Sequence, residues 1–147
     1  TRRDGLVVSF PKTIDWATVS GSYTYTQATL ESGQFEGKDF PNVPEHLFAF
    51  NTLFALPYNV SLAINGTYVG KRPFISDFTN AFEKQEDYLV INTKLMYHWK
   101  SLTPFITINN ITNEEYSEYG GISTFPVEAG FYPSPKINFL VGVSGHF

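Results

Sequence analysis

Polar and apolar residues alternate along most of the chain with the period of two that is typical of β-strands. In the segment 89–99, every second residue from Leu89 onward is apolar or Thr, while Asn92, Lys94 and His98 lie among the intervening positions. Turn residues separate such segments, and together the two signals predict seven antiparallel strands. Their predicted ranges are 4–10, 16–30, 46–56, 59–70, 87–99, 102–111 and 136–147. The predicted fold class is all-β.

The predicted connections alternate between short and long. Short turns are expected at 10–15, 56–59 and 99–102, and long loops at 31–45, 71–87 and 112–135. In an antiparallel meander this alternation puts all short turns at one end of the sheet and all long loops at the other. Aromatic residues lie beside the short turns, namely Trp16, Tyr58, Tyr97 and Trp99. Short turns, long loops and aromatic girdles are typical of outer-membrane β-barrels.

Charged residues are scarce and concentrated between the predicted strands. They make up 16% of the 147 residues, with Lys+Arg 10 against Asp+Glu 14, while aromatic residues make up 17%. No charged residue occurs between Asp15 and Glu31, between Glu45 and Lys71, between Lys100 and Glu114, or after Lys136. A soluble antiparallel sheet usually carries charges on its water-facing side. The pattern therefore favours strands that face lipid, although a soluble carbohydrate-binding β-sandwich with an aromatic platform is the alternative.

Composition narrows the function classes further. A net charge of -4 with no basic cluster argues against nucleic-acid binding. The chain has no cysteine, no Ser-His-Asp spacing and no phosphate-binding glycine loop, so we expect neither an enzyme nor a cofactor site. His46, His98 and His146 fall at different heights of the predicted sheet, which predicts no metal site.

Three motifs near the end of the chain resemble those of TonB-dependent outer-membrane receptors. Residues 109–116 (Asn-Asn-Ile-Thr-Asn-Glu-Glu-Tyr) resemble the stretch at the top of the penultimate barrel strand of this family. Residues 132–135 (Tyr-Pro-Ser-Pro) resemble the motif before its last strand. The alternating apolar positions at the end resemble the assembly signal of outer-membrane barrels, and they are Phe139, Val141, Val143 and Phe147. Lys136-Ile137 and Gly145 depart from the family pattern.

This resemblance implies an antiparallel transmembrane β-barrel segment, the C-terminal third of a 22-stranded barrel in the bacterial outer membrane. Seven strands do not close a single-chain bacterial barrel. The implied partners are outer-membrane lipid, the remainder of the barrel, a plug domain outside residues 1–147 and a TonB-type energy-coupling protein. The implied function is import of a scarce small-molecule ligand such as an iron-siderophore. A passive porin or adhesin-type barrel shares every strand feature and is the alternative.

Two groups of residues are candidates for contacts in such a transporter. Asn65, Asn92, Lys94 and His98 lie on the predicted lumen face, where they either contact the plug or are simply solvated. The last long loop contains four aromatic residues among glycines, namely Tyr119, Phe125, Phe131 and Tyr132. These rings either stack on a bulky ligand or pack the loop and form the upper girdle.

Overall fold

The protein forms one curved antiparallel sheet with a small hairpin beside it, as seen in a computed structural model that describes residues 1–123 and 125–145. The strands are β1 (Arg2–Ile14), β2 (Ala17–Thr29), β3 (His46–Leu56), β4 (Val60–Val69), β5 (Tyr88–Tyr97), β6 (Leu102–Asn109), β7 (Ser117–Ile122), β8 (Ala129–Pro133) and β9 (Asn138–Gly145). The main sheet has the order β1-β2-β3-β4-β5-β6-β9, and β7 pairs with β8. Within the described residues, no helix has the length and apolar character needed to cross a bilayer.

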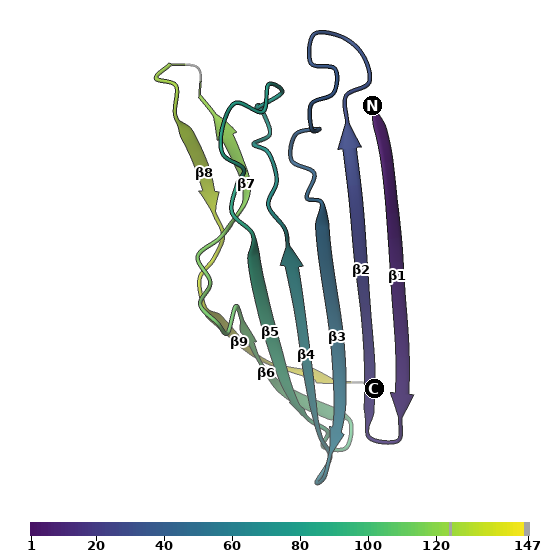
Figure 1. Cartoon of the computed structure of the whole chain (residues 1–147). Coiled ribbons are helices and arrows are strands. Elements are labelled where there is room, and N and C mark those ends of the chain that lie inside the picture. Colours follow the sequence, from purple (N-terminus) through teal and green to yellow (C-terminus); the bar gives the residue numbers. More distant parts are fainter. Residues whose placement is uncertain (124, 146–147) are drawn as a thin grey trace.

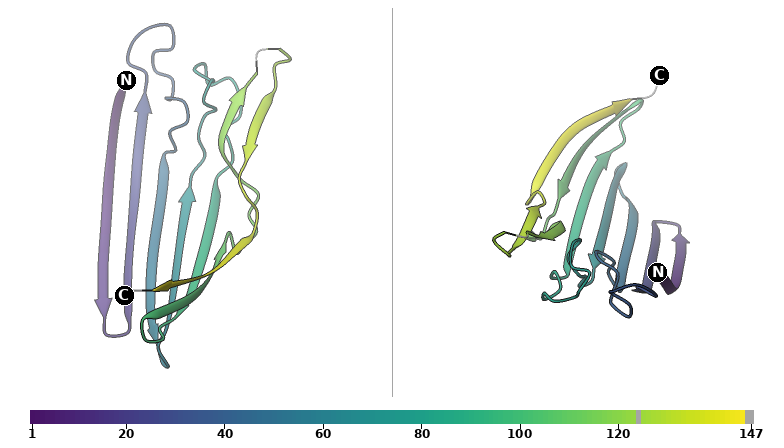
Figure 2. Two further views of the ribbon diagram at one scale, coloured as in Figure 1. Left: turned by 180° about the vertical axis from the view of Figure 1, so that it is seen from behind. Right: turned by 90° about the horizontal axis from the view of Figure 1, so that it is seen from above.

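The main sheet is a single layer whose strands are rotated progressively, so that it curves strongly when seen from above (Figure 2). The seven predicted strands are confirmed as the seven strands of this sheet. A sandwich would need a second large sheet packed on the first, whereas the second sheet of the described residues has only β7 and β8. The sandwich alternative therefore does not describe this fold.

The predicted alternation of connections is confirmed in space. Figure 1 shows the three long connections and the β7–β8 hairpin at one end of the sheet, and the short turns at the other. We call these the loop end and the turn end. Every neighbouring pair in the main sheet is antiparallel, from β1–β2 through β6–β9.

Two local predictions are wrong. The expected turn at 10–15 lies further along, because β1 continues through Pro11 to Ile14 and the chain reverses at residues 15–16. Pro11 pairs with Ser20 of β2, so the strand continues through the proline. The expected loop 112–135 contains the β7–β8 hairpin, whose glycines hide the alternation. The predicted strand 136–147 is observed at 138–145, and Phe147 lies outside the described residues.

The strand register separates an apolar from a polar face. Cross-strand partners share a face, and one row reads Thr52, Ile64, Thr93, Ile108 and Phe139 from β3 to β9. The next row toward the loop end begins with Asn51, Asn65 and Asn92. Val141 and Val143 share the face of Phe139 because they alternate along β9. The residues of the predicted assembly signal that the structure describes therefore lie together on the apolar face.

Phenylalanine rings cover glycines on neighbouring strands. Phe10 pairs with Gly21, and Phe50 pairs with Gly66, in one row across β1 to β4. A Cβ atom added to Gly21 would lie 2.3 Å from Phe10 Cζ. Each ring thus occupies the space that a side chain on the glycine would take, which packs the apolar face without large residues opposite each other.

Candidate functional site

Arg72 joins the loop 71–87 to the β7–β8 hairpin at the loop end. The side chain is 2% exposed, and its Nη2 donates hydrogen bonds to the backbone oxygens of Ser117 at 2.7 Å and Glu118 at 3.0 Å. Its guanidinium carbon lies 5.3 Å from the centre of the Tyr88 ring. Burial lowers the pKa of the guanidinium because desolvation disfavours its charged form. Sequence reasoning missed Arg72, which stands in no recognisable motif.

Further contacts hold the hairpin to the same loop. Ile75 N donates to Gly120 O at 3.0 Å, and the Ser76 hydroxyl accepts a hydrogen bond from Ile122 N at 2.8 Å. Phe74 is buried and packs against Phe131, with ring centres 5.5 Å apart. A Cβ atom on Gly120 would lie 2.7 Å from Phe74 Cε1, so the close approach requires glycine there. The loop and the hairpin therefore form one packed unit.

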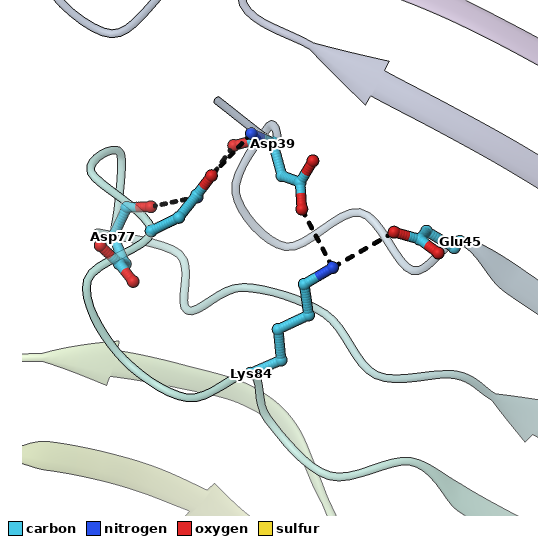
Figure 3. Close-up of polar contacts among 5 residues, drawn as sticks. Asp39, Glu45, Asp77 and Lys84 are labelled. Carbon is cyan, nitrogen blue, oxygen red and sulfur yellow. Dashed lines mark hydrogen bonds and ion pairs between the residues drawn. The ribbon is translucent and has the colours of Figure 1, made fainter. Parts of the chain in front are cut away.

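Lys84 ties the loop 71–87 to the loop between β2 and β3 (Figure 3). Its Nζ lies 3.0 Å from Asp39 Oδ2 and 3.2 Å from Glu45 Oε1. Partial burial by itself lowers the pKa of Lys84, but the bonds to the two carboxylates outweigh it and the pKa is raised. Asn80 adds a second link, because its Oδ1 accepts from Asp39 N at 2.7 Å.

Asp77 shapes the tip of the same loop. Its buried carboxylate accepts hydrogen bonds from Ala81 N at 3.0 Å, Phe82 N at 3.0 Å and the Thr79 hydroxyl at 2.9 Å. Burial by itself raises the pKa of Asp77, but these hydrogen bonds to the charged form outweigh it and the net pKa is lowered. The residues Asp-Phe-Thr-Asn at 77–80 are typical of a turn in which an Asp side chain accepts hydrogen bonds from the following backbone. Sequence reasoning did not identify this turn.

A cavity of about 670 Å³ lies between the loop 71–87 and the hairpin. We call it the loop cavity. Its wall is mainly aromatic and acidic, and its lining residues are Phe74, Phe82, Glu83, Lys84, Gln85, Glu86, Asp87, Tyr88, Glu115, Tyr116, Ser117, Ala129, Phe131 and Pro133. The volume and the aromatic lining of the loop cavity are typical of sites that bind small molecules.

The four aromatic residues predicted to bind ligand do not form one cluster. Tyr119 and Tyr132 are cross-strand partners and share one face of the hairpin. Phe131 pairs with Gly120 on the opposite face and is the one of the four that lines the loop cavity. Phe125, which is 95% exposed, lies in the connection between β7 and β8. The structure thus separates these residues into three places.

The four predicted lumen residues share the polar face at three heights. Asn92 Nδ2 donates to Asn65 Oδ1 at 3.0 Å. Lys94 lies two residues closer to the turn end, with its Nζ 4.1 Å from the centre of the Phe105 ring. His98 lies at the turn end, where its Nε2 is 2.9 Å from the Ser61 hydroxyl. The side chains line one wall without forming a compact cluster.

Asn110 is the residue of the motif at 109–116 that connects the neighbouring segments by hydrogen bonds. It is buried, has a φ of 52°, and its Nδ2 donates to the backbone oxygens of Glu114 at 2.9 Å and Pro135 at 3.3 Å. Its backbone N donates to Asn92 Oδ1 at 2.8 Å. The motif therefore connects the end of β6 to the segment that enters β9 and to the polar face.

Histidine and carboxylate side chains do not converge on a metal site within the part of the chain that is described. His46 Nδ1 lies 2.8 Å from the Tyr23 hydroxyl at the start of β3, whereas His98 lies at the turn end. His146 lies outside the described residues.

A single curved antiparallel sheet with one apolar and one polar face has the form of a wall segment of a membrane β-barrel. The sequence profile described as "TonB dependent receptor-like, beta-barrel" matches residues 2–111. This chain belongs to the TonB-dependent receptor β-barrel family. The family's members are transporters of the bacterial outer membrane, not enzymes. In a barrel of this kind the outward face is apolar, so we expect the apolar face of this sheet to contact lipid.

Solved structures of similar fold extend the match to the C-terminal strands. The siderophore receptor PiuA from Acinetobacter baumannii has a TM-score of 0.78 at 17% identity over 96% of this chain and 21% of its own. The ferric-catecholate import receptor Fiu from E. coli K12, in its open form, has a TM-score of 0.77 at 23% identity, over 99% and 21%. A mutant of the ferric enterobactin receptor PfeA from Pseudomonas aeruginosa has a TM-score of 0.76 at 16% identity, over 97% and 22%.

The chain thus spans about a fifth of the length of these proteins. No curated protein sequence matches it. The similarity to the three receptors is a similarity of fold, because each is less than 25% identical to this chain.

Proposed function

We propose that this chain is the C-terminal barrel segment of a longer TonB-dependent transporter that imports a scarce ligand such as a ferric siderophore. The observation that carries the proposal is the family match over residues 2–111. The siderophore and ferric-ligand receptors of similar fold support the ligand class. In this role the segment supplies wall and outer loops, and performs no chemistry on the ligand.

The two edges of the sheet support a longer barrel. β1 and β9 are the edge strands of the main sheet, and each has one neighbour in the described residues. Unpaired backbone groups are costly in lipid, so strands of a membrane barrel pair on both sides. We expect β1 and β9 to pair with further barrel strands of the same protein, around a plug that engages a TonB-type coupling protein.

Uptake measurements test the transport proposal. The full-length receptor is produced in a host that lacks its own siderophore receptors, with and without a functional TonB protein. We expect accumulation of a radiolabelled ferric siderophore only when TonB is active. Equal accumulation without TonB, together with free passage of a small neutral solute, supports the passive porin instead and contradicts the proposal.

The proposed ligand contacts are tested by binding at the hairpin. Replacement of Tyr119, Phe125, Phe131 and Tyr132 by Ala, one at a time, is expected to weaken siderophore binding, because each removes a stacking surface at the loop end. Tyr58→Ala is the matched control, since Tyr58 is 90% exposed in the turn between β3 and β4 at the opposite end. If all four variants bind like Tyr58→Ala, these rings serve only the packing of the loop.

The proposed plug contacts are tested by disulfide crosslinking, which is direct because the segment has no cysteine of its own. Lys94→Cys on the polar face is combined with single cysteines along the plug, and Asn65, Asn92 and His98 are treated in the same way. We expect crosslinks from these positions and none from Leu95→Cys on the lipid face. Crosslinks from Leu95→Cys alone contradict the assigned faces.

The proposed assembly signal comprises Phe139, Val141, Val143 and Phe147. Deletion of Phe147 from the full-length protein is expected to reduce the amount of folded barrel in the outer membrane, measured by heat-modifiable migration in gels. Binding by the molecules that do fold is expected to be normal. A truncated protein that assembles in normal amounts contradicts the signal.

A further inference from the structure

The loop cavity has a preformed aromatic wall. Tyr88 and Tyr116 form one pair of rings with centres 4.5 Å apart, and Phe74 and Phe131 form a second pair at 5.5 Å. Both pairs line the same cavity of about 670 Å³, together with Phe82. This volume is within the range of roughly 300–1,000 Å³ that small-molecule sites occupy.

The two sides of the cavity are held in place by different contacts. On the hairpin side, Arg72 binds the backbone oxygens of Ser117 and Glu118. On the loop side, Lys84 binds Asp39 and Glu45. A site whose walls are already ordered loses little entropy when a ligand binds.

The lining carries an excess of negative charge. Four carboxylates contribute to the cavity wall, namely Glu83, Glu86, Asp87 and Glu115, against the single ammonium of Lys84. That ammonium is already bound to Asp39 and Glu45. Lys71 pairs with Glu86 and Lys136 with Glu115 from outside the lining, and all four side chains are exposed. Exposed ion pairs contribute little, so a cationic ligand competes with Lys71 and Lys136 for these two carboxylates.

The side chain of Gln85 has a hydrogen-bond acceptor that no donor of the described residues reaches. It belongs to the cavity wall and is 3% exposed, and its side-chain oxygen has no hydrogen-bond partner among the described residues. A buried acceptor without a donor is unfavourable. Because this oxygen is closed to solvent, a ligand N–H group reaches it only when the Gln85 amide turns toward the cavity.

We propose that the loop cavity binds an organic cation that combines a flat aromatic body with an amine or amidine group. Aromatic rings attract cations over their faces, and the carboxylates neutralise the positive charge, so an anion of the same shape binds more weakly. The inference rests on the proposed function in one respect, because it assumes that the loop cavity belongs to a longer, folded receptor. It concerns binding at the loop end and requires no transport.

Equilibrium binding to the purified full-length receptor in detergent tests the proposal. The probes are proflavine, a flat cationic dye, and acridine carboxylate, an anion of similar size, followed by fluorescence polarisation. A triple variant, Glu83→Gln, Glu86→Gln and Glu115→Gln, removes charge from the wall at nearly constant shape. The control triple, Glu31→Gln, Glu36→Gln and Glu128→Gln, removes as much charge from positions outside the lining.

We expect proflavine to bind the native receptor more tightly than acridine carboxylate. The cavity triple is expected to raise the Kd for proflavine about tenfold, through loss of the nearby charges, while the control triple leaves it unchanged. Ala129→Trp, which places an indole at the cavity wall without changing charge, is expected to abolish binding of both dyes.

Equal affinity for the two dyes, equal loss in the two triples, or full binding to Ala129→Trp overturns the proposal. The binding assay does not depend on TonB. If the receptor binds the cation but shows no TonB-dependent uptake, only the proposed transport function is contradicted. If it shows uptake but does not bind the cation, only the proposed cation site is contradicted.

Discussion

The ring of Phe50 lies over Gly66 on the neighbouring strand, so closely that a Cβ atom on Gly66 would be 2.3 Å from Phe50 Cε1. The two residues are register partners in β3 and β4. Gly66 is the last position of a row in which phenylalanine and glycine alternate across four strands, Phe10, Gly21, Phe50 and Gly66. This packing explains why strand glycines, which usually weaken a sheet, are acceptable here.

We predict that Gly66→Ala lowers the free energy of unfolding by about 1–3 kcal/mol, the usual cost of overpacking, because the Phe50 ring must rotate away. Unfolding in urea, followed by Trp fluorescence, measures the effect. In a Phe50→Ala background the same substitution should cost much less. Thr67→Ala, at the next and exposed position, is the matched control and should stay within about 0.5 kcal/mol of the native protein.

A second prediction concerns the link between Arg72 and the hairpin. Arg72→Gln removes the donors to Ser117 and Glu118, so the amides of β7 and β8 should exchange hydrogen faster while those of β1 to β3 do not change. Hydrogen exchange followed by mass spectrometry measures this directly. Lys71→Gln is the control, because that neighbouring side chain makes only an exposed ion pair with Glu86. Unchanged exchange in the Arg72 variant would show that the remaining contacts hold the hairpin alone.

The pKa of Asp77 predicts a loop that loosens in acid. An Asp carboxyl ordinarily has a pKa of about 3.8, and that of Asp77 is lowered in the folded loop. A lowered folded-state pKa contributes stability that is fully present above pH 3.8 and is lost as the pH falls through the folded value. Limited proteolysis at stepwise lower pH should therefore cut the loop 71–87 progressively faster relative to the loop 31–45.

Asp77→Asn provides the control for this pH dependence. The amide cannot titrate and accepts fewer hydrogen bonds, so the loop should be cut faster already at neutral pH, with a much weaker response to acid. A variant that responds to acid as strongly as the native loop would assign the effect to other carboxylates.

The assignment of the faces yields a fourth prediction. Leu95 is 44% exposed on the apolar face, and Leu95→Arg should cost about 2–4 kcal/mol, as expected for Arg in the middle of a barrel's lipid face. The measurement is unfolding of the full-length receptor in lipid vesicles. Thr67→Arg introduces the same charge on the polar face and should be milder. If the two substitutions cost the same, the faces have been assigned incorrectly.

Strand number, strand direction and the alternation of connections followed from local patterns. Charge-free alternation at 46–56 and 59–70 predicted strands, because successive side chains of a strand point to opposite faces and the pattern needs no distant residue. The prediction of a turn at 10–15 is wrong because proline usually interrupts a strand, whereas β1 continues through Pro11 to Ile14. The predicted loop 112–135 contains the β7–β8 hairpin, which sequence patterns do not reveal because Gly120, Gly121 and Gly130 leave no alternation to detect.

The sequence by itself determined that this chain forms antiparallel strands and favoured a membrane location for them, because a period of two and the scarcity of charge are properties of neighbouring residues. The resemblance of its last segments to TonB-dependent receptors also depends only on short motifs of neighbouring residues. Only the tertiary structure decided what lies at the loop end. Arg72 and Ser117 are 45 residues apart, and Lys84 and Asp39 are joined across two loops, so no local pattern records these contacts. The loop cavity is their product, because side chains from separate loops enclose a volume only once the sheet has brought them together.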